Sequence, residues 1–397
     1  MCDLEYSESN KGAGTKTIPV HEAIGTILAH DITEIRQGGF KGRAFKKGHI
    51  VKKEDVCHLQ RLGKERLFVL NISEDEIHED EAAYVLAQAL KGQGVALQGE
   101  PREGKINLIA ERDGLLKVNK DALLQFNMTG DVMCATLHSN AVVKKGQVVA
   151  GTRAIPLVVK KRIIERAVKR AGEANGNGVI SVRHIRKPKV GVVITGNEVY
   201  HGRVQDAFAP VITQKIKALG GEISGTYYAP DDASFIEERL RELMDAGADL
   251  LITTGGMSVD PDDVTRFAVR NLGVSELSYG SAVLPGAMIM VAYISNGVGG
   301  QGSSVGSQES GVRCQVSGVR DQGSGVREAL KPDTRHPIPV LGIPACGMYH
   351  RTTVFDLVMP RILAGEHIGR KELAELGHGG LCLHCDECRY PVCPFGK

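Results

Sequence analysis

Short apolar runs separated by turn residues dominate the first part of the chain. Between residues 40 and 150, runs such as 106–110, 115–118 and 148–151 are separated by Gly, Asn and Asp. This pattern is typical of short strands joined by tight turns. The sequence therefore predicts a β-rich region, interrupted by one helix over residues 79–90.

Two further segments carry apolar residues at helical spacing. Residues 17–31 and 158–171 each place apolar residues three or four positions apart, which predicts an amphipathic helix in both. The polar face of the second helix would carry Lys160, Lys161, Arg162, Arg166, Lys169 and Arg170. No aromatic residues are interleaved for base stacking, so we interpret this face as solvated rather than as a nucleic-acid-binding patch.

Beyond residue 188, strand-like and helix-like segments alternate. Strands are predicted over 190–195, 223–229 and 250–254, and helices over 206–219, 232–246 and 261–271. The runs VGVVIT and LLITT do not alternate between polar and apolar residues, which is typical of strands buried on both faces. Such an order forms right-handed βαβ units around a mostly parallel sheet. We predict a three-layer αβα domain over residues 188–370, after a β-rich α+β region over 1–187.

A low-complexity segment over residues 296–336 interrupts this domain. It is rich in Gly and Ser and repeats the tetrad SGVR three times, a composition typical of disordered loops. The strand-like runs 288–294 and 338–342 flank it, so we expect an insertion at the tip of a hairpin. Residues 297–302 match the pattern G-x-G-x-x-G, but no helix follows them, so we reject a dinucleotide site.

Composition and charge exclude several classes of protein. In a chain of 397 residues, 49 Lys and Arg balance 47 Asp and Glu, so no net field favours a nucleic acid or an acidic membrane as partner. The longest apolar runs are far short of the roughly 18 residues that span a bilayer. The first ten residues lack the basic and apolar regions of a secretory signal. We therefore expect a soluble, cytoplasmic protein.

Two glycine-containing loops follow predicted strands at their carboxyl ends. Together they contain Thr195, Gly196, Thr254, Gly255, Gly256 and Ser258. Ligands of open parallel sheets bind at this edge. Glycine lets backbone N–H groups approach an anion, and the hydroxyls add donors. The sequence therefore predicts a site for a phosphate-bearing ligand.

Carboxylates lie close to the second loop. Asp260, Asp262 and Asp263 stand at the predicted start of a helix, where Asp260 is a suitable N-cap. Three carboxylates would repel a phosphate unless a cation lay between them, and Mg²⁺ binds one or two carboxylates together with substrate phosphates. We therefore predict a Mg²⁺ site here. Asp231 and Asp232, before the preceding helix, are interpreted as helix caps.

These segments resemble a known family. VITGNEV, TTGGMSVDPDD, LPGAM and GIPACGMYHRTTVFDLVMPRILAGE are similar to the molybdopterin-binding domain of molybdopterin molybdenumtransferases, which adenylyltransferases share, over residues 190–294 and 338–366. The segment PVHEAIGTILAHDI, within residues 16–33, resembles the helix that begins the molybdenumtransferases. The resemblance implies an enzyme that inserts molybdate into adenylated molybdopterin with Mg²⁺ and releases AMP.

By motif position, the resemblance also implies roles for individual residues. Glu198 and Asp263 would be the catalytic, Mg²⁺-binding carboxylates. The substrate-binding residues would be Thr195, Gly196, Thr254, Gly255, Gly256, Ser258, Pro285 and Gly286. The expected partners are molybdopterin or adenylated molybdopterin and molybdate. A homo-oligomer, and a molybdoenzyme or cofactor-pathway partner, stay open.

The sequence departs from the family at several motifs. The family's TGDE is TGNE here, which removes a carboxylate at Asn197, and its KPGKP is LPGAM, which removes lysines at Leu284 and Ala287. A lysine beside an anion contributes about 1.5–3 kcal/mol. The lost lysines favour a non-catalytic molybdopterin carrier or sensor, whereas the N-terminal segment favours the transferase. A nucleotide pyrophosphatase on the same domain is a third alternative.

The C-terminal tail, residues 371–397, contains a separate signal. Four cysteines lie there in the pattern C-x2-C-x2-C-x4-C: Cys382, Cys385, Cys388 and Cys393. Four thiolates so spaced bind Zn²⁺ tetrahedrally or hold an iron–sulfur cluster. We predict a small metal-binding tail and leave both metals open. Cys346, near the predicted site, is interpreted as a small buried residue.

Overall fold

The computed structural model describes residues 15–26, 28–36, 40–70, 73–173, 177–257, 264–295, 337–391 and 393–396. These form two compact units, and the division falls between Ile185 and Arg186. We call them unit 1 and unit 2 and describe each by itself. The predicted insertion over 296–336 lies outside the described residues.

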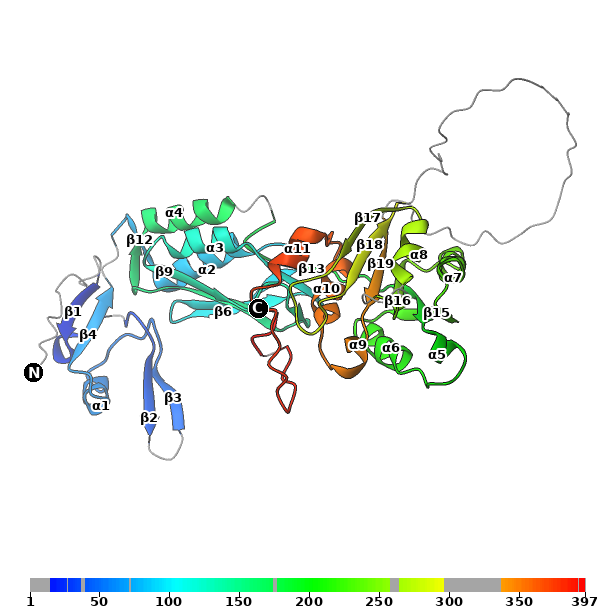
Figure 1. The fold of residues 1–397 in the computed structure, drawn as a ribbon. Helices are drawn as coiled ribbons and strands as arrows, with labels where there is room; N and C mark the ends of the chain where they lie inside the picture. Colours follow the sequence, from blue (N-terminus) through cyan, green and yellow to red (C-terminus); the bar gives the residue numbers. More distant parts are fainter. Residues whose placement is uncertain are drawn as a thin grey trace, which may run out of the picture. The chain divides into compact units, whose positions relative to one another are not determined.

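In its described residues, unit 1 is built from short antiparallel strands and four α-helices (Figure 1). Its strands are β1 (Thr15–Pro19), β2 (Ile32–Arg36), β3 (Phe40–Phe45), β4 (Arg66–Leu70), β5 (Glu76–His78), β6 (Val95–Arg102), β7 (Lys105–Ala110), β8 (Gly114–Val118), β9 (Val132–Thr136), β10 (Val142–Val143), β11 (Val148–Ala154), β12 (Val158–Lys160) and β13 (Ile180–Arg183). Its helices are the 3-10 turn η2 (Val20–Glu22), α1 (Asp55–Arg61), α2 (Glu79–Leu90), α3 (Lys120–Asn127) and α4 (Lys161–Gly172).

The helix predicted over residues 17–31 is wrong. This segment begins in β1, where Ile18 pairs with Leu67 of β4, and continues as the three-residue turn η2. Pairing with β4 occupies the backbone groups that a helix would need for its own hydrogen bonds. The apolar spacing still marks buried positions, because Val20, Ala23 and Leu28 all lie in the small core of this part of unit 1.

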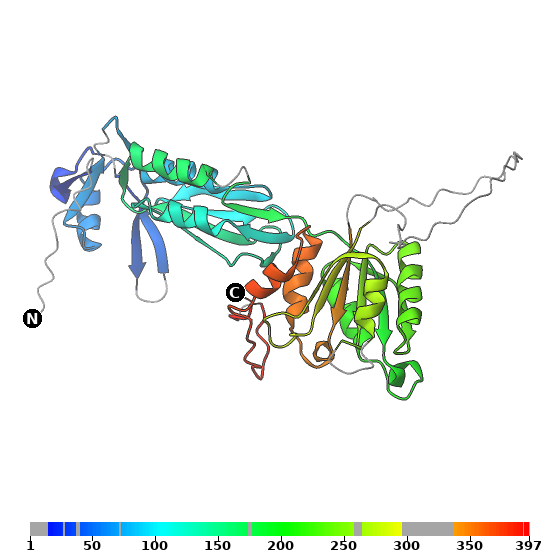
Figure 2. The same ribbon diagram turned by 45° about the horizontal axis from the view of Figure 1, so that its top comes forward.

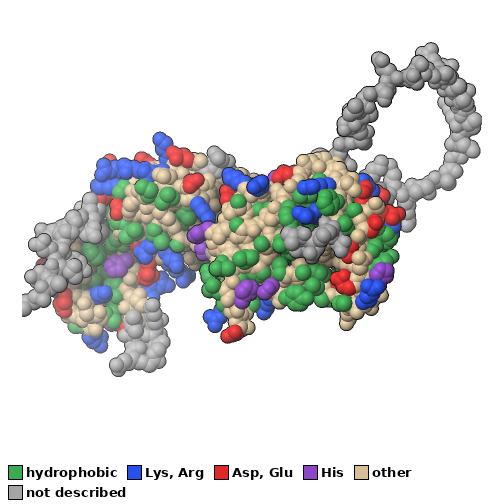
Figure 3. Space-filling model, viewed as in Figure 1, with side chains coloured by type: hydrophobic (Ala, Val, Ile, Leu, Met, Phe, Trp, Pro, Cys, Tyr) green, Lys and Arg blue, Asp and Glu red, His purple; other side chains and the backbone are tan. Residues whose placement is uncertain are grey.

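The larger part of unit 1 has a core between antiparallel sheets and α2, α3 and α4. Its sheets have the orders β6-β7-β11-β9, β10-β8-β13 and β12-β5. The predicted bounds of α2 are confirmed. Helix α4 begins only after the short strand β12, and Lys and Arg side chains gather over its outer face (Figure 3).

Unit 2 alternates strands and helices as predicted. Its strands are β14 (Lys189–Thr195), β15 (Glu222–Ala229), β16 (Leu250–Thr254), β17 (Val274–Tyr279), β18 (Met290–Ile294) and β19 (Ile338–Ile343). Its helices are α5 (Asn197–Tyr200), α6 (Phe208–Ala218), α7 (Ala233–Asp245), α8 (Thr265–Asn271), α9 (Cys346–Tyr349), α10 (Val354–Leu363) and α11 (Arg370–Glu375). The predicted strands and helices over 190–254 are confirmed to within about two residues at each end.

One six-stranded sheet organises unit 2, in the order β15-β14-β16-β19-β18-β17. Neighbours from β15 to β19 pair in parallel, whereas β18 is antiparallel to both of its neighbours. Helices α7 and α8 cover one face and α10 lies on the other (Figure 2). The mixed α/β fold with a mostly parallel sheet in three layers, after a β-rich N-terminal region, is therefore confirmed.

The hairpin of β18 and β19 carries the insertion point. Ile294 at the end of β18 pairs with Ile338 at the start of β19, so the segment between them leaves and re-enters the sheet at one place, as predicted. Within the described ranges, none of the helices is both long and apolar enough to cross a bilayer.

Candidate functional site

The carboxyl ends of three parallel strands meet at one edge of the sheet in unit 2. Ile194 near the end of β14 pairs with Thr254 of β16, and Thr254 pairs with Ile343 of β19. The reversed strand β18 starts at the same edge, because Met290 pairs with Gly342. Chain segments that follow β14, β16 and β19, or precede β18, therefore gather at this edge, which we call the site edge.

A buried hydroxyl ties the first two predicted loops together. Thr195 is 4% exposed, and its Oγ1 donates a hydrogen bond of 2.6 Å to the carbonyl oxygen of Thr254. The Thr195 hydroxyl oxygen also lies 3.3 Å from Oγ1 of Thr265, the first residue of α8. The loops after β14 and β16 are thus neighbours, as predicted.

The glycines in these loops occupy positions where no other residue fits. Gly255 has φ of +74°, and a Cβ atom there would lie 2.6 Å from the carbonyl oxygen of Thr195. A Cβ atom on Gly256, with φ of +54°, would collide with the Thr265 hydroxyl. The loops therefore approach each other through bare backbone. In the first loop, Gly196 N–H donates to the carbonyl oxygen of Ala229 at 3.2 Å.

The first loop folds its acidic side chain back over its own glycine. A Cβ atom on Gly196 would lie 2.8 Å from Oε1 of Glu198, and the Glu198 side chain is exposed. Asn197 N–H donates to Asp231 Oδ2 at 3.0 Å, and Asp231 N–H donates to Asn197 Oδ1 at 3.3 Å. Asp231 therefore holds this loop rather than capping a helix, which corrects the prediction. Asp232 is the N-cap of α7, as predicted.

Two further threonine hydroxyls are buried at the end of β16. Thr253 and Thr254 are 0% exposed, and neither Oγ1 has a hydrogen-bond partner within the described chain. Thr254 directly precedes Gly255. Most buried side-chain hydroxyls have a hydrogen-bond partner, so these two stand out within the described chain.

Two predicted site residues cannot be placed. Ser258 and Asp263 fall in residues 258–263, outside the described residues, together with Asp260 and Asp262. Of the predicted Mg²⁺ ligands, only the exposed Glu198 carboxylate is therefore located. It lies beside the glycine loops, where an oxygen ligand for Mg²⁺ fits, and the Mg²⁺ site stays a prediction.

The loop that contains Pro285 and Gly286 also lies at the site edge, just before β18. Both residues are buried, and the carbonyl oxygen of Pro285 accepts a hydrogen bond from Val354 N–H at the start of α10. Leu284, where the related family has a lysine, is 55% exposed. This loop therefore presents an apolar side chain to solvent instead of a cation.

The cysteines of unit 2 do not form a metal centre in the described structure. All four tail cysteines are free thiols. Across the described residues, no group of three or more His, Cys, Asp or Glu side chains is arranged to hold a metal ion. Cys346, at the start of α9, has a raised pKa because it is partly buried, as expected for a small packing residue.

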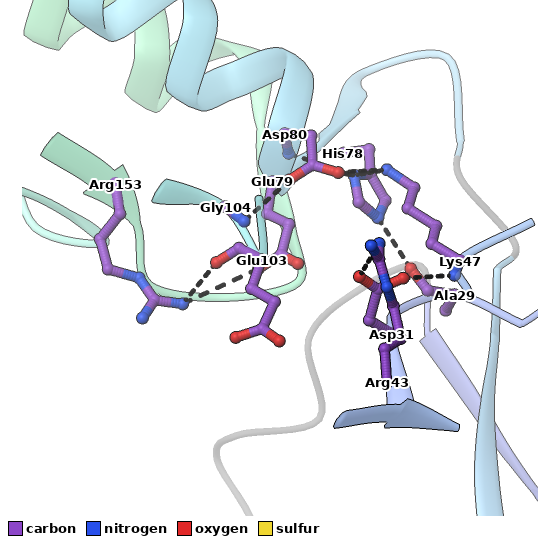
Figure 4. Close-up of polar contacts among 10 residues, drawn as sticks. All are labelled: Ala29, Asp31, Arg43, Lys47, His78, Glu79, Asp80, Glu103, Gly104 and Arg153. Atoms are coloured by element: carbon purple, nitrogen blue, oxygen red, sulfur yellow. Dashed lines mark hydrogen bonds and ion pairs between the residues drawn. The ribbon is translucent and has the colours of Figure 1, made fainter. Parts of the chain in front are cut away.

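A second group of ionisable residues, in unit 1, was not predicted from the sequence. His78 caps α2, and its Nδ1 lies 2.7 Å from Lys47 Nζ while its Nε2 lies 3.1 Å from the carbonyl oxygen of Ala29 (Figure 4). Lys47 also pairs with Asp80 at 2.8 Å. Since all these groups have partners, they connect the small N-terminal core to α2 rather than form an open site.

Glu79, beside this group, is a buried carboxyl with a strongly raised pKa. Its side chain is 7% exposed, and Oε2 lies 3.9 Å from Arg153 Nη2 (Figure 4). Burial, and then the neighbouring charge of Asp80, raise the pKa of Glu79 to about 7. No sequence signal marks this carboxyl, because its burial depends on the close approach of Gly104.

Comparison with known families gives two matches. Residues 191–363 match a family described as "Probable molybdopterin binding domain". Residues 17–71 match a family described only as a domain of unknown function. The first match covers the sheet, the two glycine loops and the Pro285 loop of unit 2, and it supports the molybdopterin-binding type of domain.

Individual relatives match shorter stretches. A CinA-like protein from Mycobacterium avium is 42% identical over 89 residues, which are 21% of this chain and 20% of that protein. The alignment thus spans about one fifth of the relative's length. A molybdopterin biosynthesis protein, MoaB, from Thermus thermophilus has 19% identity and a TM-score of 0.28 over 45% of this chain and 98% of its own. A molybdopterin biosynthesis protein from Pyrococcus horikoshii has 15% identity and a TM-score of 0.27 over 89% and 75%.

Proposed function

We propose that the site edge of unit 2 binds the phosphorylated end of a molybdopterin-type substrate, and that the protein acts in molybdenum cofactor biosynthesis. The observation that carries the proposal is the contact between the two glycine loops. Thr195 and Gly255 meet there through bare backbone, and the residue before Gly255, Thr254, has a buried hydroxyl with no partner among the described residues. Backbone N–H groups and hydroxyls so placed are suited to bind phosphate oxygens. The family match over residues 191–363 agrees with this assignment.

In the full form of the proposal, the protein is a molybdenumtransferase. Molybdate would be inserted into adenylated molybdopterin, and AMP would leave. Mg²⁺ would supply charge neutralisation between the carboxylates and the substrate phosphates. Glu198 would contribute one carboxylate and Asp263 the second.

A non-catalytic molybdopterin carrier or sensor is the second candidate. The observation that favours it is the exposed Leu284 at a position where the related family has a lysine. Without that charge, the loop before β18 cannot donate a charge-assisted hydrogen bond to a substrate anion, a bond that contributes about 1.5–3 kcal/mol. Binding then depends on the two glycine loops alone.

One assay separates these candidates. The purified protein is incubated with adenylated molybdopterin, molybdate and Mg²⁺, and both AMP and protein-bound molybdenum are measured. AMP release with molybdenum retained supports the transferase, whereas tight pterin binding without AMP supports the carrier. Hydrolysis of unrelated dinucleotides would instead support a pyrophosphatase. Asp263→Ala should abolish Mg²⁺-dependent AMP release, and unchanged release would refute the role of this carboxylate.

A further inference from the structure

Arg266 lies in the first turn of α8, next to the second glycine loop. The residue before it, Thr265, has its hydroxyl oxygen 3.3 Å from Oγ1 of Thr195. A Cβ atom on Gly256 would collide with the same Thr265 hydroxyl. Because Thr265 is also fully buried, the start of α8 is fixed against both glycine loops. This position places Arg266 at the site edge.

An aromatic ring at the end of β17 supports the Arg266 side chain. Tyr279 pairs with Met290, the first residue of β18, so it also lies at the site edge. Its ring centroid is 4.5 Å from Cζ of Arg266. The Tyr279 hydroxyl donates to the carbonyl oxygen of Met257, the residue after Gly256. The guanidinium group therefore lies over a ring that is itself attached to the second glycine loop.

The guanidinium group of Arg266 has no anionic partner within the described chain. Its Nε is buried without a hydrogen-bond partner there, and it forms no ion pair with a described carboxylate. Arg239 on α7 also lies over a tyrosine ring, but it pairs with Glu238 and Glu242 at 2.9 Å each. A partly buried cation without an anion is unfavourable. Arg266 is therefore suited to receive its anion from a ligand.

We propose that Arg266 binds a tetrahedral oxyanion at the site edge, either a phosphate group of the substrate or molybdate. A guanidinium group offers two parallel N–H donors to such an anion, and stacking on a ring does not occupy these in-plane donors. The related family has lysines where this chain has Leu284 and Ala287. Arg266 would supply positive charge from a different element of the same edge. The identity of the ligand rests on the proposed function.

Direct titration of the full-length protein with sodium molybdate and with inorganic phosphate, at constant ionic strength, tests the proposal. We expect the wild type to bind one of these anions saturably, and the tighter anion identifies the source of the oxyanion. Arg266→Gln should weaken this binding by about 10- to 100-fold, as expected for loss of a charge-assisted pair. Arg266→Lys keeps the charge but not the paired donors and should weaken it less.

Arg270→Gln is the matched control. It removes an equal charge from the last turn of the same helix, where the side chain is exposed. This change should alter the affinity for the anion by less than about twofold, because exposed and distant charges are screened by salt. Circular dichroism and the Tm of each variant establish that it is folded.

Two results would overturn the proposal. One is the absence of saturable binding of both anions to the wild type up to about 10 mM. The other is equal affinity of the wild type and Arg266→Gln, which would show that Arg266 serves another partner. Asp260, Asp262 and Asp263 are the nearest carboxylates in the sequence for such a role.

A titration with molybdopterin separates this proposal from the proposed function. If the wild type binds an oxyanion through Arg266 but binds no molybdopterin, the proposed function fails and the anion site stands. If the wild type and Arg266→Gln bind molybdopterin and both anions equally well, the proposed function stands and the assignment of Arg266 fails.

Discussion

The buried threonines of the sheet allow a sharp test of how the site edge is held together. Thr195→Val removes the hydroxyl that donates to the Thr254 carbonyl, whereas Thr253→Val makes the same change on the neighbouring strand, where the hydroxyl has no partner within the described chain. Both side chains are at most 4% exposed, and valine has nearly the shape of threonine. The pair therefore isolates the contacts of the Thr195 hydroxyl, which are the bond to the Thr254 carbonyl and the 3.3 Å contact with Thr265 Oγ1.

Loss of a bond that leaves a buried acceptor unsatisfied costs about 1–3 kcal/mol. For a unit of this size, each kcal/mol corresponds to about 2–4 °C in Tm. Thr195→Val should therefore lower the Tm of unit 2 by about 2–12 °C. Thr253→Val removes an unpartnered buried hydroxyl and should leave Tm unchanged or raise it. Differential scanning calorimetry of the full-length variants measures both, and equal losses in the two would refute the reasoning.

Three further predictions follow from described contacts. Gly255→Ala should weaken pterin binding by about tenfold or more, because the added Cβ atom would collide with Thr195. The control Gly273→Ala has a similar φ but open space around it, and it should change binding by less than about threefold. A direct titration measures both affinities. Glu79→Gln should stabilise unit 1 above pH 7 and have little effect near pH 4. The folded pKa of Glu79 is raised to about 7, so the folded wild-type protein is most stable while this carboxyl is protonated. Its free energy of unfolding falls as the pH rises through about 4.5–7. Chemical denaturation at the two pH values checks this, and a constant difference between Glu79→Gln and wild type would contradict it. Replacing residues 296–336 by a short turn should leave pterin affinity within about twofold, because β18 and β19 are already paired at Ile294 and Ile338; a large loss of affinity would show that the segment takes part in binding.

The sequence predicted the parts of the fold that depend on local pattern. The continuous apolar strands of unit 2 and the bounds of α2 could be predicted, because burial on one or both faces requires a regular pattern of apolar residues in the sequence. The helix predicted over residues 17–31 was wrong because a strand and a turn can bury Val20, Ala23 and Leu28 as well as a helix can. Helices α1 and α3 were missed, since each is at most eight residues long.

For the candidate site, the edge of the sheet could be predicted from local pattern, whereas contacts between distant segments could not. Glycines after two parallel strands predicted one shared edge of the sheet, and the structure brings Gly255 and Gly256 close to Thr195, the residue before Gly196, at that edge. The role of Asp231 could not be predicted, because its hydrogen bonds to Asn197 cross from one loop to another. The pKa of Glu79 was equally hidden, as it depends on burial by residues distant in the chain.

The antiparallel strand β18 gives changes in chain length different consequences before and after it. Because β18 is antiparallel to its neighbours, it begins at the site edge and ends at the opposite edge of the sheet. A change in length between β18 and β19 therefore starts and ends at the edge opposite the proposed binding site, whereas a change in the few residues before β18 lies beside that site. A fluorescent or affinity module fused between Ile294 and Ile338 would report on the protein from its far side.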